Sequence, residues 1–166
     1  MRFDERIGGV LVAPRRTFAR LGAGEARPSD VAWLVVMRLV AGELDRLARA
    51  VGVAREFGVG AAAQEILAVA SVVMPDVVGI LAAGVVMQLC SRSKRAFDVA
   101  AYAWVPYLTV QLAGALAFSA RGVAPGATAR AALEGLGLLW ALAVWIVALV
   151  ELRKLPADAG DAKVKS

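Results

Sequence analysis

Residues 66–90 read ILAVASVVMPDVVGILAAGVVMQLC, residues 97–120 read FDVAAYAWVPYLTVQLAGALAFSA, and the basic turn Ser91–Arg95 joins the two runs. A helix needs about 20 mostly apolar residues to cross the roughly 30 Å hydrocarbon core of a bilayer. Both runs are that long, and a short connection rich in Lys and Arg is typical of a cytoplasmic loop. The stretch therefore predicts a transmembrane helical hairpin whose turn lies in the cytoplasm.

The composition of the whole chain favours the same class of protein. Hydrophobic residues make up 60% of the 166 residues, whereas about 45–50% is usual in soluble domains. The net charge of +5 suits contact with an anionic inner leaflet. The basic residues flank apolar runs and form no aromatic-interleaved patch, so the pattern argues against a nucleic-acid partner.

The residue inventory also limits the chemistry that we expect. The chain has no histidine and a single cysteine, Cys90, so it lacks the commonest general base and cannot form an internal disulfide. We find no phosphate-binding loop, no nucleophile–base pair and no metal-ligand spacing. We therefore expect no enzyme, no catalytic residue, no metal site and no cofactor.

Four spans are predicted, at about residues 31–51, 64–90, 97–120 and 132–152. They would form an all-α transmembrane bundle, the domain 29–155, with a glycine-rich loop at 52–60 between the first two spans. The first span is the weakest, because Arg38, Glu43 and Asp45 would lie at depth and each central charge costs about 2.5–3.5 kcal/mol. The alternative is a half-buried helix that ends near Gly42.

The distribution of positive charge decides between these two readings. With four spans, the N-terminal arm, the turn Ser91–Arg95 and the C-terminal tail fall on one side of the membrane, and this side holds most of the Lys and Arg. The positive-inside rule then places both termini in the cytoplasm. Because the composition is rich in Ala, Arg and Val, we expect a bacterial inner membrane.

The N-terminal arm, residues 1–28, has apolar residues at steps of three and four, with most arginines on the other face. This spacing predicts an amphipathic helix, split in two by Gly8-Gly9 and Pro14. We expect the arm to lie in the cytoplasmic membrane interface; packing on the bundle or on a partner is the alternative. The candidate interfacial residues are Arg15, Arg16, Phe18 and Arg20. The tail, residues 156–166, is polar and aperiodic, and we expect it to be disordered.

Ionisable groups at membrane depth are the candidate functional residues, because they are costly to bury. The groups at depth are Arg38, Glu43, Asp45, Asp76 and, nearer an edge, Asp98, and the candidates that we single out are Arg38, Asp45 and Asp76. Asp76 could pair with Arg38 or with Arg46, which would offset two desolvation costs. Such a pair would serve a proton or ion path or bind a substrate's charge, or it would only fix the register of the helices.

Other residues are expected to shape the helices around this pair. Pro75 and Pro106 permit kinks, and Gly79 and Gly84 offer a small-residue face for close packing. Three aromatic residues of the third span could anchor it at the lipid headgroups: Tyr102, Trp104 and Tyr107. Ser29 or Asp30 could cap the first span.

Two short boxes resemble a known family. Leu11-Val-Ala-Pro14-Arg-Arg-Thr-Phe18-Ala-Arg-Leu21 resembles the proline–arginine–phenylalanine box that precedes the first span of bacterial Yip1-domain membrane proteins. Phe97-Asp-Val-Ala-Ala-Tyr102-Ala-Trp-Val-Pro106 resembles the segment that follows the family's basic or glycine-rich turn. The layout departs from the family, which usually has five spans and glycines in that turn.

The resemblance implies an all-helical integral membrane protein and supplies no catalytic residue. Eukaryotic members bind prenylated small GTPases, a role that we do not carry over to a bacterial chain. The expected function is a non-enzymatic scaffold or accessory subunit, which contacts the lipid bilayer and other membrane subunits or its own copies. The alternative is a small transporter or permease component that uses Asp76 and Arg38.

Overall fold

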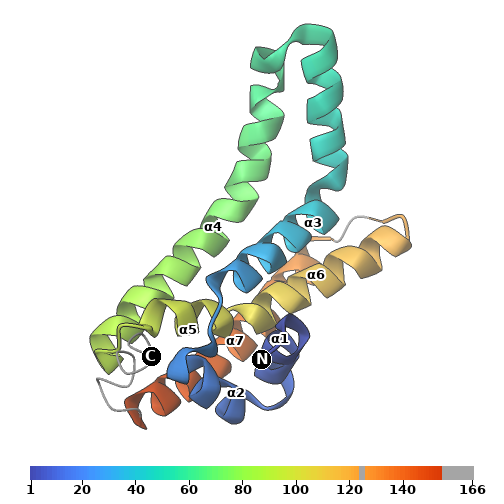
Figure 1. Cartoon of the computed structure of the whole chain (residues 1–166). Coiled ribbons are helices and arrows are strands. Elements are labelled where there is room, and N and C mark those ends of the chain that lie inside the picture. The colour runs from blue at the N-terminus through green and yellow to red at the C-terminus, as the bar shows by residue number, and fades with distance from the viewer. Residues whose placement is uncertain (124–125, 155–166) are drawn as a thin grey trace.

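The computed structural model describes residues 1–123 and 126–154, apart from the side chains of residues 28, 41, 42 and 44–46, and these residues are almost entirely helical (Figure 1). The expected all-helical class is confirmed, and the described ranges contain no strand. In chain order the elements are α1 (Phe3–Val12), α2 (Pro14–Arg20), the π-helical turn η1 (Leu21–Glu25), α3 (Pro28–Phe57), α4 (Val59–Ser91), α5 (Ala96–Ala103), α6 (Val105–Ala120) and α7 (Ala127–Lys154).

Three of the helical stretches described are long and apolar enough to cross a membrane: α4, the stretch Ala96–Ala120 formed by α5 and α6, and α7. They correspond to the second, third and fourth predicted spans. α3, the first predicted span, is not among them, although it packs along α4 and α6. The membrane class is thus supported by three helices, and the crossing of α3 stays a prediction.

The connection between α3 and α4 differs from the predicted loop at 52–60. Both helices continue through this region and only Gly58 separates them, with a φ of 84° that favours glycine. At about 1.5 Å per residue, the 33 residues of α4 are about 50 Å long. The end of this hairpin, residues 49–67, which we call the hairpin tip, extends beyond the other helices (Figure 1).

The two prolines inside predicted spans have different effects. α4 continues through Pro75, as transmembrane helices often do when neighbours or side chains compensate for the lost hydrogen bond. The third span is interrupted at Trp104, whose N–H bonds to Ala101 O at 3.1 Å, and Pro106 occupies the first turn of α6. Proline is tolerated there because the first-turn amides have no helical acceptor. The expected irregularity at Pro106 is therefore a break between two helices.

The N-terminal arm folds back on one end of the bundle. Pro14 begins α2, as predicted, whereas α1 runs through Gly8-Gly9 without the predicted break. Val10, Phe18 and Leu21 are fully buried and belong to the main core. The apolar face that we expected on lipid is thus covered by the protein itself, mainly by α7 and α6. Contact of the arm's exposed side with the membrane interface stays a prediction.

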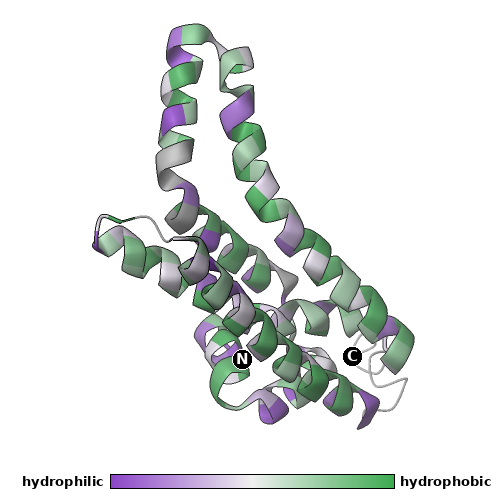
Figure 2. Ribbon diagram, turned by 180° about the vertical axis from the view of Figure 1, so that it is seen from behind, coloured by the Kyte–Doolittle hydropathy of each residue, from purple (hydrophilic) through white to green (hydrophobic). Residues whose placement is uncertain are grey.

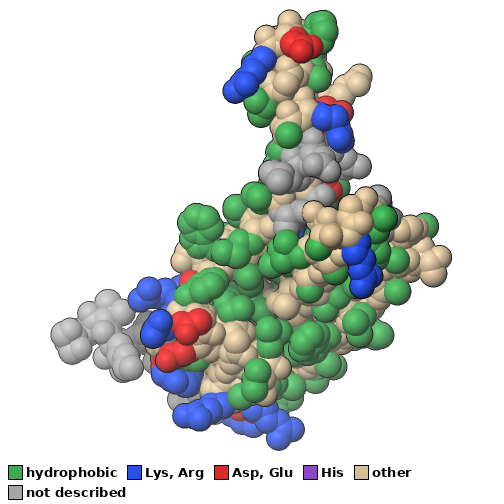
Figure 3. All heavy atoms as spheres, turned by 90° about the vertical axis from the view of Figure 1, so that its right-hand side faces the viewer, with side chains coloured by type: hydrophobic (Ala, Val, Ile, Leu, Met, Phe, Trp, Pro, Cys, Tyr) green, Lys and Arg blue, Asp and Glu red, His purple; other side chains and the backbone are tan. Residues whose placement is uncertain are grey.

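Glycines permit the close helix packing in this core, as predicted for Gly79 and Gly84. A Cβ on Gly79 would lie 2.6 Å from the Trp104 ring, and one on Gly84 would overlap the Phe97 ring. Figure 2 shows hydrophobic residues along the middle of the helices and hydrophilic ones toward the arm and the hairpin tip. Figure 3 shows the same division, with an apolar flank and basic side chains gathered at the end that holds the arm.

We call the end of the molecule that holds the arm the basic end. It comprises the arm (residues 1–27), the turn Ser91–Arg95 and the last turn of α7 (residues 151–154).

Candidate functional site

The predicted intramembrane pair forms between α3 and α4. Arg38 Nη1 lies 3.0 Å from Asp76 Oδ2, and the two side chains are 14% and 3% exposed. Tyr107 of α6 interacts with the same carboxylate. We call Arg38, Asp76 and Tyr107 the interior triad. The structure selects Arg38 as the partner of Asp76, whereas the alternative partner Arg46 and the candidate Asp45 have side chains that lie outside the described residues.

Small residues bring the helices of the interior triad together. Tyr107 packs on α7 at Gly137, where a Cβ would lie 3.0 Å from Tyr107 Cδ2 and 3.3 Å from its Cα. The Trp104 ring is 5.4 Å from the Tyr107 ring and lies over Gly79, one helical turn after Asp76. The triad therefore lies between α3, α4, α6 and α7, with the Trp104 ring beside it.

Hydrogen bonding in this region is incomplete. Within the described part of the chain, three buried side-chain atoms have no hydrogen-bond partner: Asp76 Oδ2, Trp104 Nε1 and Gln111 Nε2. The contact of Asp76 Oδ2 with Arg38 is thus an ion pair without hydrogen-bond geometry. A buried polar atom without a partner costs about 1–3 kcal/mol. Such atoms are therefore reasons to suspect a functional role or a bound water.

A second cluster of the same residue types joins the arm to the bundle. The Arg6 guanidinium donates to Asp30 Oδ2 and to Met1 O. The Tyr102 hydroxyl lies 2.8 Å from Asp30 Oδ2 and 2.9 Å from Arg27 O, and it accepts a hydrogen bond from the Arg27 N–H at 2.9 Å. We call Arg6, Asp30 and Tyr102 the latch triad.

The side chains of the latch triad are buried, so their contacts hold the arm against the bundle. Arg6 is 3% exposed, Asp30 is 4% exposed and Tyr102 is fully buried. The hydrogen bond with Asp30 raises the pKa of the Arg6 guanidinium, although burial opposes this shift. Two predictions are wrong here. Neither Ser29 nor Asp30 caps α3, and Asp30 pairs with Arg6 instead. Tyr102 is a fully buried core residue and not a headgroup anchor.

A further ion-pair cluster at the surface joins the N-terminus to the C-terminal part of the arm. Glu25 Oε2 is 2.7 Å from the Met1 amine, and Arg20 donates to both carboxylate oxygens of Glu25 at 3.1 Å. The bond from the Met1 amine, followed by that from Arg20, lowers the pKa of Glu25 to about 2. Arg20, a predicted interfacial residue, is thus engaged within the arm.

The other predicted arm residues divide by exposure. Arg15 and Arg16 are exposed, whereas Phe18 is buried in the core. Phe18 and Tyr102, one from each family-like box, belong to the same core cluster. Sequence reasoning missed Arg6, Asp30, Tyr102 and Gln111 as site residues. For Arg6, the available signal in the sequence was the position of an arginine within the apolar face of a helix. For Asp30, the sequence offered no signal beyond its place before a span.

The arrangement limits what the interior triad can do. An ion pair enclosed by four helices can carry or hold a proton and can bind a small polar group, but the described residues contain no cluster of His, Cys, Asp and Glu that could hold a metal ion. Comparison with protein-family models, with curated proteins and with solved structures finds no match. The Yip1-domain resemblance therefore stays a prediction, and the functional argument rests on the residues themselves.

Proposed function

We propose that this chain is a non-enzymatic integral membrane protein that acts as a scaffold or accessory subunit through helix–helix contacts. In this proposal α3 also crosses the membrane, as the first of four spans, both termini lie on the cytoplasmic side of a bacterial inner membrane, and the fold is of the Yip1-domain type. The basic end then faces the cytoplasm, in agreement with the positive-inside rule, and the hairpin tip lies on the opposite side.

The hairpin tip is the observation that carries the proposal. The buried side chains of its two helices are small: Ala50 on α3 is 7% exposed and Ala62 on α4 is 1% exposed. Its outer surface instead presents Phe57 at 73%, Val59 at 75% and Leu67 at 67% exposure. Apolar side chains that the chain itself leaves uncovered beyond the bundle favour contact with the helices of another membrane subunit.

Photo-crosslinking tests this proposal directly. A photoreactive amino acid at Phe57 should yield one discrete crosslinked membrane protein, identified by mass spectrometry after a mild-detergent pull-down. The same probe at Leu139, which is 70% exposed on α7, is the matched control and should crosslink mainly to lipid. Equal, diffuse crosslinking from both positions would overturn the scaffold proposal.

The proposed threading has its own test. Single cysteines at Glu56 and Ser93, in a Cys90→Ser background, should be labelled from opposite sides of the membrane. Labelling of both positions from the cytoplasm would show that α3 does not span.

A second candidate function is a small transporter component that uses Asp76 and Arg38. Trp104 Nε1 and Gln111 Nε2, which have no hydrogen-bond partner, and Asp76 Oδ2, which has only its ion pair with Arg38, favour it, since a substrate or a water chain could satisfy them. Asp76→Asn should abolish proton-coupled flux in reconstituted liposomes if this function is correct. Unchanged flux together with lowered thermal stability would support a purely structural pair.

A further inference from the structure

The acidic side chains at the basic end, and Asp30 beside it, are largely paired within the protein. Glu25 pairs with the Met1 amine and Arg20, Asp30 pairs with Arg6, and Glu151 pairs with Lys154. Among the described residues, these contacts leave several arginines without a carboxylate partner: Arg15, Arg16, Arg92, Arg95 and Arg153. The structure thus concentrates unneutralised guanidinium groups at one end.

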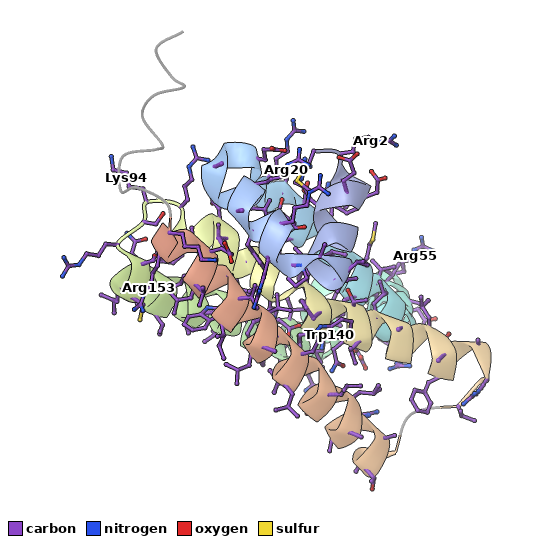
Figure 4. All side chains as sticks on the ribbon, turned by 90° about the horizontal axis from the view of Figure 1, so that it is seen from below. Arg2, Arg20, Arg55, Lys94, Trp140 and Arg153 are labelled. Atoms are coloured by element: carbon purple, nitrogen blue, oxygen red, sulfur yellow. The ribbon has the colours of Figure 1, made fainter. Side chains whose placement is uncertain are left out.

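Two of these arginines lie where α4 and α7 end side by side. Arg153 Nε donates to Cys90 O at 3.2 Å, which joins the last turn of α7 to the last turn of α4. Arg92, the left-handed residue that ends α4 with a φ of 54°, follows Cys90 by two positions. Only Nε of Arg153 is used by this bond, so its two terminal nitrogens remain available to a phosphate group. Figure 4 shows Arg153 and Lys94 at the same edge of the basic end.

Apolar side chains lie directly next to these arginines on both helices. On α4, Val86 and Leu89 are 47% and 73% exposed and precede Arg92 by two turns and one turn. On α7, Ile146 and Val150 are 51% and 47% exposed and precede Arg153 in the same way. Each helix therefore presents an apolar stripe that leads to an arginine.

We propose that the junction of α4 and α7 binds an anionic phospholipid, whose phosphate contacts Arg92 and Arg153 and whose acyl chains lie on the two apolar stripes. Guanidinium groups match phosphate oxygens with paired donors. The stripes favour a lipid over a nucleic acid or an acidic protein, because neither of these would need apolar side chains beside the arginines. The inference rests on the membrane placement of the proposed function and names a lipid class for it.

Lipid selection by the purified protein tests the inference. The detergent-solubilised full chain is incubated with equal amounts of phosphatidylglycerol and phosphatidylcholine, and retained lipid is measured by native mass spectrometry. We expect at least a fivefold preference for phosphatidylglycerol, about the factor of one arginine at an anionic surface. The double variant Arg92→Gln/Arg153→Gln should lose this preference.

Three comparisons keep the test decisive. Arg55→Gln, at the hairpin tip, is the matched control and should retain the preference. The variant Leu89→Gln/Val150→Gln keeps both arginines and should reduce total lipid retention. It provides a second test of the lipid site if the arginine variant does not fold. Glycerol 3-phosphate is the soluble competitor; displacement of the lipid by it at equal concentration would show a site for free phosphate and would overturn the lipid assignment.

Failure of the inference and failure of the proposed function give different results. Equal retention of both lipids by a chain that remains in the membrane after carbonate extraction would overturn only the lipid site. Release of the chain by carbonate would instead overturn the membrane placement on which both proposals depend.

Discussion

The two Arg–Asp–Tyr triads use the same residue types and share α3, yet they differ in how completely their polar atoms are bonded. In the latch triad, Asp30 is contacted by both Arg6 and Tyr102 through hydrogen bonds. In the interior triad, Asp76 Oδ2 has an ion pair but no hydrogen bond. A fully bonded buried cluster fixes one structure, whereas a partly bonded one is a candidate for function.

The depth of each triad gives the physical reason for this difference. The latch triad lies at the basic end, where the arm provides backbone groups, such as the Arg27 N–H and the Met1 carbonyl, that complete the network. The interior triad lies between long helices, whose backbone groups already bond within each helix. Its polar atoms must be satisfied by side chains, by water or by a ligand.

The largest expected effect follows from breaking the latch triad. Asp30→Ala leaves the Arg6 charge buried without a counter-ion, which should lower the free energy of unfolding by about 3–5 kcal/mol. The measurement is unfolding in mixed micelles, with tryptic cleavage at Arg15 and Arg16 as the readout of arm release. Asp4→Ala removes an exposed ion pair with Arg2 and is the matched control. Equal effects of the two variants would contradict the latch.

A double-mutant cycle in the interior triad should give a somewhat smaller effect. Asp76→Leu and Arg38→Met should each lower the free energy of unfolding by about 2.5–3.5 kcal/mol, because each leaves one charge among the helices. The combined variant should recover most of this loss, since apolar replacement of a buried pair is often neutral. Additive losses would show that the pair is not coupled and would remove the basis of the comparison.

The two tyrosines give a direct comparison of bonding. Tyr102→Phe leaves the Arg27 N–H without its acceptor and the buried Asp30 carboxylate without the Tyr102 hydroxyl, and it should cost about 1–3 kcal/mol. Tyr107→Phe removes one interaction of an incompletely bonded cluster, and we expect a cost of about 1 kcal/mol or less. Both variants are read out by the same unfolding experiment. A larger effect at Tyr107 would reverse the assignment of the two triads.

The smallest expected effect concerns pH and the surface of the arm. Folding lowers the pKa of Glu25 from its ordinary value of 4.5 to about 2. The ionised carboxylate therefore stabilises the arm fully above about pH 4.5, and this contribution is lost as the pH falls toward 2. Glu25→Gln should reduce the pH dependence of the protection of the arm from pepsin, a protease that works at low pH, measured between pH 5 and 2.5. An unchanged profile would mean that Glu25 does not hold the arm.

Several parts of the fold could be predicted from the sequence because they depend on local composition. The spans at 64–90 and 132–152 lie within α4 and α7, since long apolar runs specify both membrane insertion and helix. The pairing of Asp76 with a basic residue of α3 could be predicted from the free-energy cost of burial alone, because a buried charge without a counter-ion is so unfavourable. The choice of Arg38 needed the packing of α3 on α4.

Other features could not be predicted because the decisive partner is distant in sequence. Gly52 and Gly60 suggested a loop, but helix packing in the hairpin outweighs the weak local preference of glycine. Tyr102 looked like an interfacial aromatic residue, yet it contacts Arg27 and Asp30, more than 70 positions away. Its role depends on where the arm lies.

The sequence by itself determined that this chain is helical, apolar enough for a membrane and basic at one end, because hydrophobicity and charge are properties of each segment. Only the tertiary structure decided which arginine meets which aspartate, that the arm covers its own apolar face, and that one triad is fully bonded while the other is not. These outcomes depend on the packing of helices through Gly79, Gly84 and Gly137, where the absence of a side chain permits contacts that no single segment specifies.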